Sequence, residues 1–335
     1  MKAFFHSAQN QHHPRTYLTR GQMRAPQEIP ERTKRILAGL ESADVPVVEP
    51  DDHGMRPIAL VHDLGYIRFL ESAHRRWPGD WGDEVLSNVF VRSPNTLRGI
   101  LAEAACYLAD GSCPVGEHTW TSAYYSAQSA VSAAHALMAG ERAAYAVCRP
   151  PGHHARRDAA GGFCYLNNAA IAATELQTRF PRVAILDPDM HHGQGIQETF
   201  WERSDVLYVS IHADPTNFYP VVTGFEDERG AGAGYGYNIN LPMPHGSPEA
   251  VFFERLDEAI RAVRLFGPDV LVVPLGFDTY REDPQAQVAL SSGGFARMAS
   301  ALREIGVPVL VVQEGGYFLD GLAENTRQFF SGLEL

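Results

Sequence analysis

Carboxylates and histidines follow short apolar runs of this sequence, in residue types and spacing that suit a metal centre. The segment Asp187–His191 (DPDMH) extends one such run. If it continues as a strand, its alternate residues Asp187, Asp189 and His191 point the same way. A carboxylate and the imidazole of this segment, with Asp278 from another run, make a set of two Asp and one His. Three protein ligands and an open position are typical of a catalytic metal such as zinc; an Asp/His pair held by strand-end hydrogen bonds is the alternative.

Two adjacent histidines, His153 and His154, stand in a Pro-Gly loop after another apolar run. A hydrolytic site needs a base that takes a proton from water and an acid that protonates the leaving group, and histidine suits both near pH 7. Each imidazole needs an acceptor that orients it, and Asp187 and Gln194 are the candidates. Tyr317 follows two glycines, which allow a sharp turn, so its phenol is a candidate oxyanion donor. A tyrosine packed in the core is the alternative.

The runs that precede these residues are predicted strands of a parallel sheet. They are short, rich in Val, Ile and Leu, and apolar on both faces, as buried parallel strands must be. Ligands bind at the carboxyl ends of such strands, which is where the polar residues of this sequence lie. The five runs are Ala143–Cys148, Arg182–Asp187, Val206–His212, Asp269–Leu275 and Val307–Glu314.

Helical patterns alternate with these strands. Thr121–Ala139 and Asn167–Gln177 are rich in alanine, and a third helix is predicted between Ser247-Pro248, with Ser247 as its N-cap, and Gly267-Pro268. The alternation, without a linker or an internal repeat, predicts a single α/β domain over residues 1–335 with a mainly parallel sheet flanked by helices. The irregular segments Pro14–Pro30 and Arg75–Thr96 are candidates for site walls or contact surfaces.

Composition narrows the class of ligand. The chain has 335 residues, of which 40 are acidic and 28 basic, so its formal net charge is −12. This charge argues against nucleic acid and anionic membranes as partners and favours a neutral or cationic ligand. No apolar run reaches the ~20 residues of a membrane helix, no signal-peptide core opens the chain, and its four cysteines form no disulfide framework. We therefore expect a cytoplasmic protein.

Taken together, the motifs of the sequence resemble those of the histone deacetylase and acetylpolyamine amidohydrolase superfamily. The segments RPPGHHA, GGFCYLNNAA, LDPDMHHGQG, GFDT and EGGY match in order and spacing, and the resemblance covers roughly residues 20 to 330. It implies an arginase-type α/β fold and the hydrolysis of an N-acyl amine with one Zn²⁺ per chain. The residues that it implies are Asp189, His191 and Asp278 as metal ligands, His153 and His154 as catalytic histidines, Asp187 as the partner of His153, and Tyr317 as the oxyanion donor.

The sequence departs from the family pattern at the partner of His154. The family usually has Asp or Asn there, whereas this chain has Gln194. An amide orients His154 but stabilises its protonated form less than a carboxylate does, so we expect a lower pKa for His154 than in Asp-bearing relatives. The resemblance also maps an aromatic slot for the alkyl chain onto Phe163 and Tyr219, where the second residue is usually Phe. Core packing is the alternative for these aromatics.

Within the superfamily the chain is most similar to the bacterial acetylpolyamine amidohydrolases, through its early loops, its EGGY motif and the segment 210–220 (SIHADPTNFYP). This subgroup implies a homodimer whose Arg75–Thr96 contact narrows the entrance, and an acylated amine as substrate. Glu103 is then the candidate carboxylate for the distal ammonium, with a solvated helix face as the alternative. The family also implies a structural K⁺ near Asp187, Asp189, His191 and Ser210.

Three other functions are alternatives for these motifs. A broader acyl-lysine protein deacylase is the main alternative, and a non-catalytic acyl-binding protein conflicts with the intact His153, His154 and Tyr317. A dimetal ureohydrolase of the arginase type needs an Asp two residues after Asp278, where the sequence has Tyr280.

Overall fold

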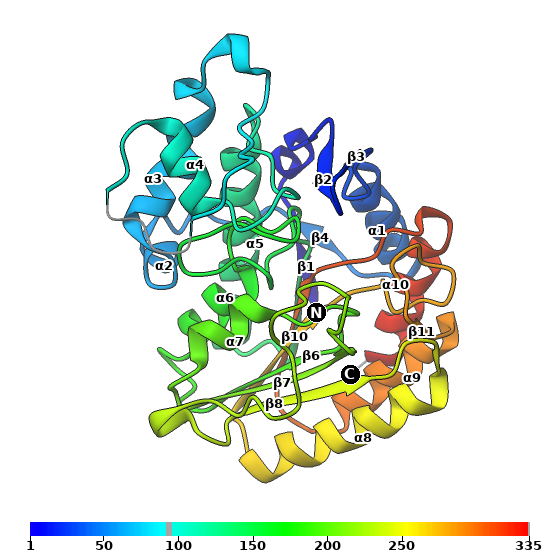
Figure 1. The fold of residues 1–335 in the computed structure, drawn as a ribbon. Helices are drawn as coiled ribbons and strands as arrows, with labels where there is room; N and C mark the ends of the chain where they lie inside the picture. Colours follow the sequence, from blue (N-terminus) through cyan, green and yellow to red (C-terminus); the bar gives the residue numbers. More distant parts are fainter. Residues whose placement is uncertain (92–95, 334–335) are drawn as a thin grey trace.

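A parallel sheet forms the centre of the molecule. The computed structural model describes residues 1–91 and 96–333, and within them eight strands form one sheet in the order β4-β1-β5-β12-β10-β6-β7-β8 (Figure 1). All neighbouring strands of this sheet run parallel, as the sequence predicts. Its strands are β1 (Lys2–Phe4), β4 (Val47–Val48), β5 (Ala143–Ala146), β6 (Val183–Asp187), β7 (Val206–Ala213), β8 (Asn238–Met243), β10 (Val270–Leu275) and β12 (Val309–Gln313).

Alternating side chains of the strands fill two cores, one on each face of the sheet. In β5, for example, Tyr145 belongs to one core and Ala146 to the other, and both are fully buried. This explains why the runs are apolar at every position. One face is covered by α1 (Glu31–Ser42), α8 (Glu249–Phe266), α9 (Ser292–Arg303) and α10 (Leu319–Leu333). The other is covered by α2 (Arg56–Ala59), α3 (Leu64–Arg76), α4 (Ile100–Tyr107), α5 (Thr119–Met138), α6 (Asn168–Leu176) and α7 (Gln194–Phe200), as Figure 1 shows.

The predicted helix boundaries are close to the observed ones, with one error. Gly267 ends α8 in the left-handed conformation, with φ of 64°, as its position predicts. Ser247 is not the N-cap of this helix, because Pro248 occupies that place and the Ser247 hydroxyl donates to the carbonyl of Pro244. Ser247 lies instead in β9 (Ser247–Pro248), which pairs with β11 (Val288–Ala289).

The two irregular segments differ in their local structure. The first contains a hairpin of β2 (Tyr17–Thr19) and β3 (Gln22–Arg24), which the sequence did not predict. The second begins at the end of α3, and residues 92–95 of it lie outside the described part of the chain. Among residues 1–91 and 96–333, none of the helices has both the length and the hydrophobicity that crossing a bilayer requires.

Candidate active site

Three potential metal ligands meet where β6 and β10 end. Asp189 and His191 follow β6, Asp278 follows β10, and their ligand atoms all lie within 4.8 Å of one another. His191 Nδ1 is 3.0 Å from Asp278 Oδ2 and 3.4 Å from Asp189 Oδ1. All three residues are buried. The two strands are neighbours in the sheet, so their carboxyl ends bring together residues almost ninety positions apart.

The backbone leaves room for this cluster and neutralises part of its charge. A Cβ built on Gly276 would overlap the Asp189 carboxylate, and one built on Gly315 would overlap that of Asp278. The amide of Gly315 donates to Asp189 Oδ2 over 3.0 Å, and the amide of Met190 donates to Asp278 Oδ1 over 3.1 Å. Both glycines are therefore needed for the close approach of the two carboxylates.

The cluster has the electrostatics of a cation site. Burial, together with the neighbouring Asp189, raises the pKa of Asp278 to about 6. Burial opposes protonation of His191, but hydrogen bonds to Asp189 and Asp278 outweigh it and raise the pKa of His191 to about 9. A positive charge between the two carboxylates is thus strongly favoured, and a divalent metal would replace that proton. Two Asp and one His with an open side suit zinc, so the residues fit the metal that the sequence predicts.

The two histidines have opposite electrostatic surroundings. His153 Nδ1 is 3.1 Å from Asp187 Oδ2; burial disfavours its charged form, but Asp189 and Asp187 raise the pKa of His153 to about 10. His154 Nδ1 is 2.6 Å from Gln194 Oε1. Burial and the positive charges of His153 and His191 hold the pKa of His154 well below its usual value. These surroundings favour the charged form of His153 and the neutral form of His154, which is the form able to accept a proton.

Glu314 fixes the loop that carries the histidines. Its Oε2 accepts hydrogen bonds from the amides of Gly152 (2.6 Å) and His153 (3.0 Å), and burial raises the pKa of Glu314 to about 7. Glu314 directly follows β12, and β12 is the neighbour in the sheet of β5, the strand that leads into the histidine loop. The first residue of the EGGY motif thus joins the tyrosine segment to the histidine segment.

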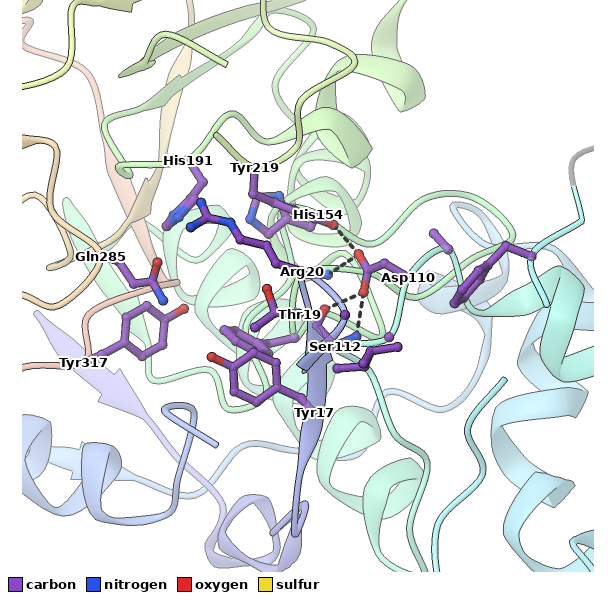
Figure 2. A pocket seen from close by; sticks show the side chains of 17 residues that line it. Tyr17, Thr19, Arg20, Asp110, Ser112, His154, His191, Tyr219, Gln285 and Tyr317 are labelled. Atoms are coloured by element: carbon purple, nitrogen blue, oxygen red, sulfur yellow. Dashed lines mark hydrogen bonds between the residues drawn. The ribbon is translucent and has the colours of Figure 1, made fainter. Parts of the chain in front are cut away.

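Tyr317 follows β12 and its hydroxyl points into a cavity (Figure 2). Asp283 Oδ2 accepts from the amides of Tyr317 (2.6 Å) and Phe318 (2.9 Å), and the Arg32 guanidinium lies 4.9 Å from the centre of the Tyr317 ring. Arg32 also donates to the carbonyls of Gly316 and Glu314, each over 2.6 Å. Burial raises the pKa of Tyr317 well above its usual value, so the phenol keeps its proton and is able to donate it in a hydrogen bond.

The cavity has a volume of about 440 Å³, and His191 is the member of the metal-ligand cluster that lines it. His191, His154 and Tyr317 line it, and the aromatic side chains of Phe163 and Tyr219 form part of its wall. Phe163 adopts a φ of 67°, a strained conformation for a bulky residue that turns its side chain towards the site. The β2–β3 hairpin supplies further lining residues, which are Tyr17, Leu18, Thr19, Arg20 and Gly21.

The structure does not bring Glu103 to this cavity. Glu103 lies on α4 and forms an ion pair with Arg76 of α3, and it is not among the lining residues. Asp110, two residues after the end of α4 and its cap, supplies the one carboxylate among the described lining residues. The sequence offered no signal for it, because Asp110 is one of 40 acidic residues and belongs to none of the motifs. Arg32 and Asp283 also belong to none of the motifs, so the sequence did not indicate their contacts with the Tyr317 segment.

Comparison with known protein families assigns the class of this site. The family model for the histone deacetylase domain matches residues 26–333. The chain belongs to the histone deacetylase family and is a hydrolase of the deacetylase class.

The relatives include several proteins of one subgroup. The chain is 64% identical over 335 residues to the acetylpolyamine amidohydrolase of Burkholderia pseudomallei (strain 1710b), covering 99% of this chain and 98% of that protein. It is 38% identical to the acetylpolyamine amidohydrolase of Mycoplana ramosa, covering 99% of each. The crystal structure of acetylpolyamine aminohydrolase from Burkholderia pseudomallei superposes with a TM-score of 0.98 at 64% identity, over 99% of this chain and 98% of that one. The crystal structure of the HDA15 HD domain superposes with a TM-score of 0.82 at 26% identity, over 99% of this chain and 88% of that one.

Replacing Gln194 with Asp should move the acidic limb of the pH profile to higher pH. A carboxylate beside His154 stabilises the imidazolium, which raises the pKa of His154 and keeps this base protonated at pH values where the wild-type residue is neutral. The measurement is kcat/KM for an N-acetyl amine across pH, with Gln194→Asn as the neutral control of equal length. An unmoved limb in Gln194→Asp would contradict the assigned role of Gln194.

Proposed function

We propose that this protein removes the acetyl group from N-acetylated polyamines or related amines, the activity that the names of several relatives describe for those proteins. The observation that carries the proposal is the grouping of Asp189, His191 and Asp278 beside a cavity that His154 and Tyr317 line. His153 and His154 are held by hydrogen-bond distances to Asp187 and Gln194. The 64% identity to an acetylpolyamine amidohydrolase supports the choice of amine.

Asp189, His191 and Asp278 would hold one Zn²⁺ per chain. Bound there, zinc supplies a Lewis acid for the acetyl carbonyl and for water. Potassium near Asp187, Asp189, His191 and Ser210 is a further part of the proposal, supported by the pairing of Asp187 with Ser210 in neighbouring strands β6 and β7.

The protein groups account for the movement of protons. Neutral His154 takes a proton from water as the water oxygen attacks the acetyl carbon. The same proton then passes to the substrate nitrogen as the carbon–nitrogen bond breaks, which releases acetate and the free amine. Charged His153, paired with Asp187, supplies a fixed positive charge, and the Tyr317 hydroxyl donates a hydrogen bond to the oxyanion.

The walls of the cavity select the substrate. Phe163 and Tyr219 present aromatic surface to an alkyl chain, and a chain without branches fits between such walls. We also propose that the chain forms a homodimer through residues 75–96, of which 92–95 lie outside the described residues. Trp81, Val89 and Phe90 of this segment are exposed, and Phe90 also lines the cavity, so a second copy packed there would narrow its entrance.

Tyr317→Phe should lower kcat by roughly 10²–10³, the range measured for the loss of other oxyanion donors. The change removes one hydroxyl from the cavity and keeps the ring that packs beside Arg32. Steady-state kinetics on acetylputrescine measure the change in kcat. Tyr280→Phe is the control, because the Tyr280 hydroxyl contacts Glu282 and Tyr280 does not line the cavity. Near-full activity of Tyr317→Phe would show that the oxyanion is stabilised elsewhere.

A panel of substrates tests the proposed function. We expect higher kcat/KM for acetylputrescine, acetylcadaverine and acetylspermidine than for an acetyl-lysine peptide. Because the chain carries a net charge of −12, kcat/KM for the cationic substrates should also fall as salt rises, while that for neutral N-acetylbutylamine stays constant. A preference for the peptide would favour a protein deacylase instead.

A further inference from the structure

A continuous chain of hydrogen bonds runs from the cavity wall to His154. Asp110 Oδ2 accepts from the Tyr219 hydroxyl over 2.7 Å, the Tyr219 oxygen accepts from Gln194 Nε2 over 3.3 Å, and Gln194 Oε1 lies 2.6 Å from His154 Nδ1. Figure 2 shows Asp110, Tyr219 and His154 together on one side of the cavity. The four residues come from separate parts of the sequence, and none of them is proposed to hold the metal.

Asp110 determines which groups donate and which accept along this series of hydrogen bonds. Its Oδ1 accepts from the amide and the hydroxyl of Ser112, and its Oδ2 accepts from the amide of Gly162 as well as from Tyr219. An ionised carboxylate accepts hydrogen bonds and cannot donate them. The Tyr219 proton is therefore directed to Asp110, which leaves the Tyr219 oxygen as an acceptor towards Gln194. Burial and the nearby Asp110 raise the pKa of Tyr219 well above its usual value, so this proton stays in place.

The position of the Tyr219 proton then determines the orientation of the Gln194 side-chain amide. A glutamine amide has two orientations of nearly equal shape, which exchange its oxygen and its NH₂ group. Only one of them satisfies both neighbours: the NH₂ group faces the Tyr219 oxygen, and Oε1 faces His154. His154 must then carry its proton on Nδ1, which leaves Nε2 free to accept a proton. The opposite orientation would place two acceptor oxygens together and would require the proton of His154 on Nε2.

We propose that Tyr219, anchored by Asp110, is a positioning residue that fixes the Gln194 amide and thereby sets the tautomer in which His154 acts as a base. The ring of Tyr219 also packs edge-on to His154, with centroids 4.8 Å apart, so replacing this residue with Phe keeps the ring contact and removes only the hydroxyl. The effect of this positioning on catalysis rests on the proposed function, in which His154 is the base. The tautomer of His154 does not depend on that function.

Nitrogen NMR of the metal-loaded enzyme tests the tautomer without substrate. In protein labelled with ¹⁵N-histidine, the signals of His154 are identified by their loss in His154→Ala. We expect a protonated Nδ1 and an unprotonated Nε2 in the wild-type protein and in Tyr280→Phe, the control for loss of a hydroxyl. Tyr219→Phe should shift these signals towards the Nε2-protonated form. Wild-type signals in Tyr219→Phe would overturn the proposal, whether or not the deacetylase activity is confirmed.

A double-mutant cycle with Gln194→Glu links the tautomer to turnover. A glutamate has the length of glutamine and two equivalent oxygens, so it accepts from His154 Nδ1 in either orientation and needs no help from Tyr219. Tyr219→Phe alone should lower kcat about twofold or more, because the productive orientation is then only one of two. On the Gln194→Glu background the same change should no longer lower kcat, with an equal effect on KM in both backgrounds. Each variant is compared on the plateau of its own pH profile, because a carboxylate at position 194 raises the pKa of His154.

The double-mutant cycle also distinguishes a positioning role of the Tyr219 hydroxyl from a role limited to lining the cavity. If the hydroxyl serves only the shape or polarity of the cavity, its removal lowers kcat by the same factor on both backgrounds, and the proposal is wrong.

Discussion

The site depends on the burial of two carboxylates, Asp189 and Asp278, beside the imidazole of His191. Buried carboxylates are costly unless hydrogen bonds and an opposite charge compensate them. The amides of Gly315 and Met190 supply part of the compensation, and a cation bound between the carboxylates would supply the rest. The parallel sheet meets this requirement because it brings the carboxyl ends of β6, β10 and β12 to one edge.

The same edge gives two adjacent histidines different tasks. Asp187 faces His153 and raises its pKa, whereas the amide of Gln194 faces His154, whose pKa is lowered by burial and by the neighbouring imidazoles. In the proposed mechanism, this difference between a carboxylate and an amide would separate electrostatic support by His153 from proton transfer by His154. The contacts of Glu314, Arg32 and Asp283 hold the backbone of the histidine and tyrosine segments in place.

The sequence predicted the parts of the structure that follow from local patterns. Strand runs apolar on both faces indicate a parallel sheet, and polar residues at their ends must share one edge, which is why the metal ligands could be proposed. Contacts between distant segments were not accessible in this way. The sequence predicts Glu103 at the entrance, but Glu103 pairs with Arg76 from its position on α4, and Asp110 lines the cavity instead. Gln194 and Tyr219 were each noted as departures from the family pattern, and only the fold shows that they are hydrogen-bonded.

Metal content tests the central claim most directly. Elemental analysis of the purified protein should give one zinc per chain, and His191→Ala should lose this zinc while keeping the far-ultraviolet circular dichroism of the wild type. Asn238→Ala, which alters a buried polar residue of β8 outside the cluster, is the control and should retain it. Two metals per chain, or zinc that persists in His191→Ala, would contradict the three-ligand site.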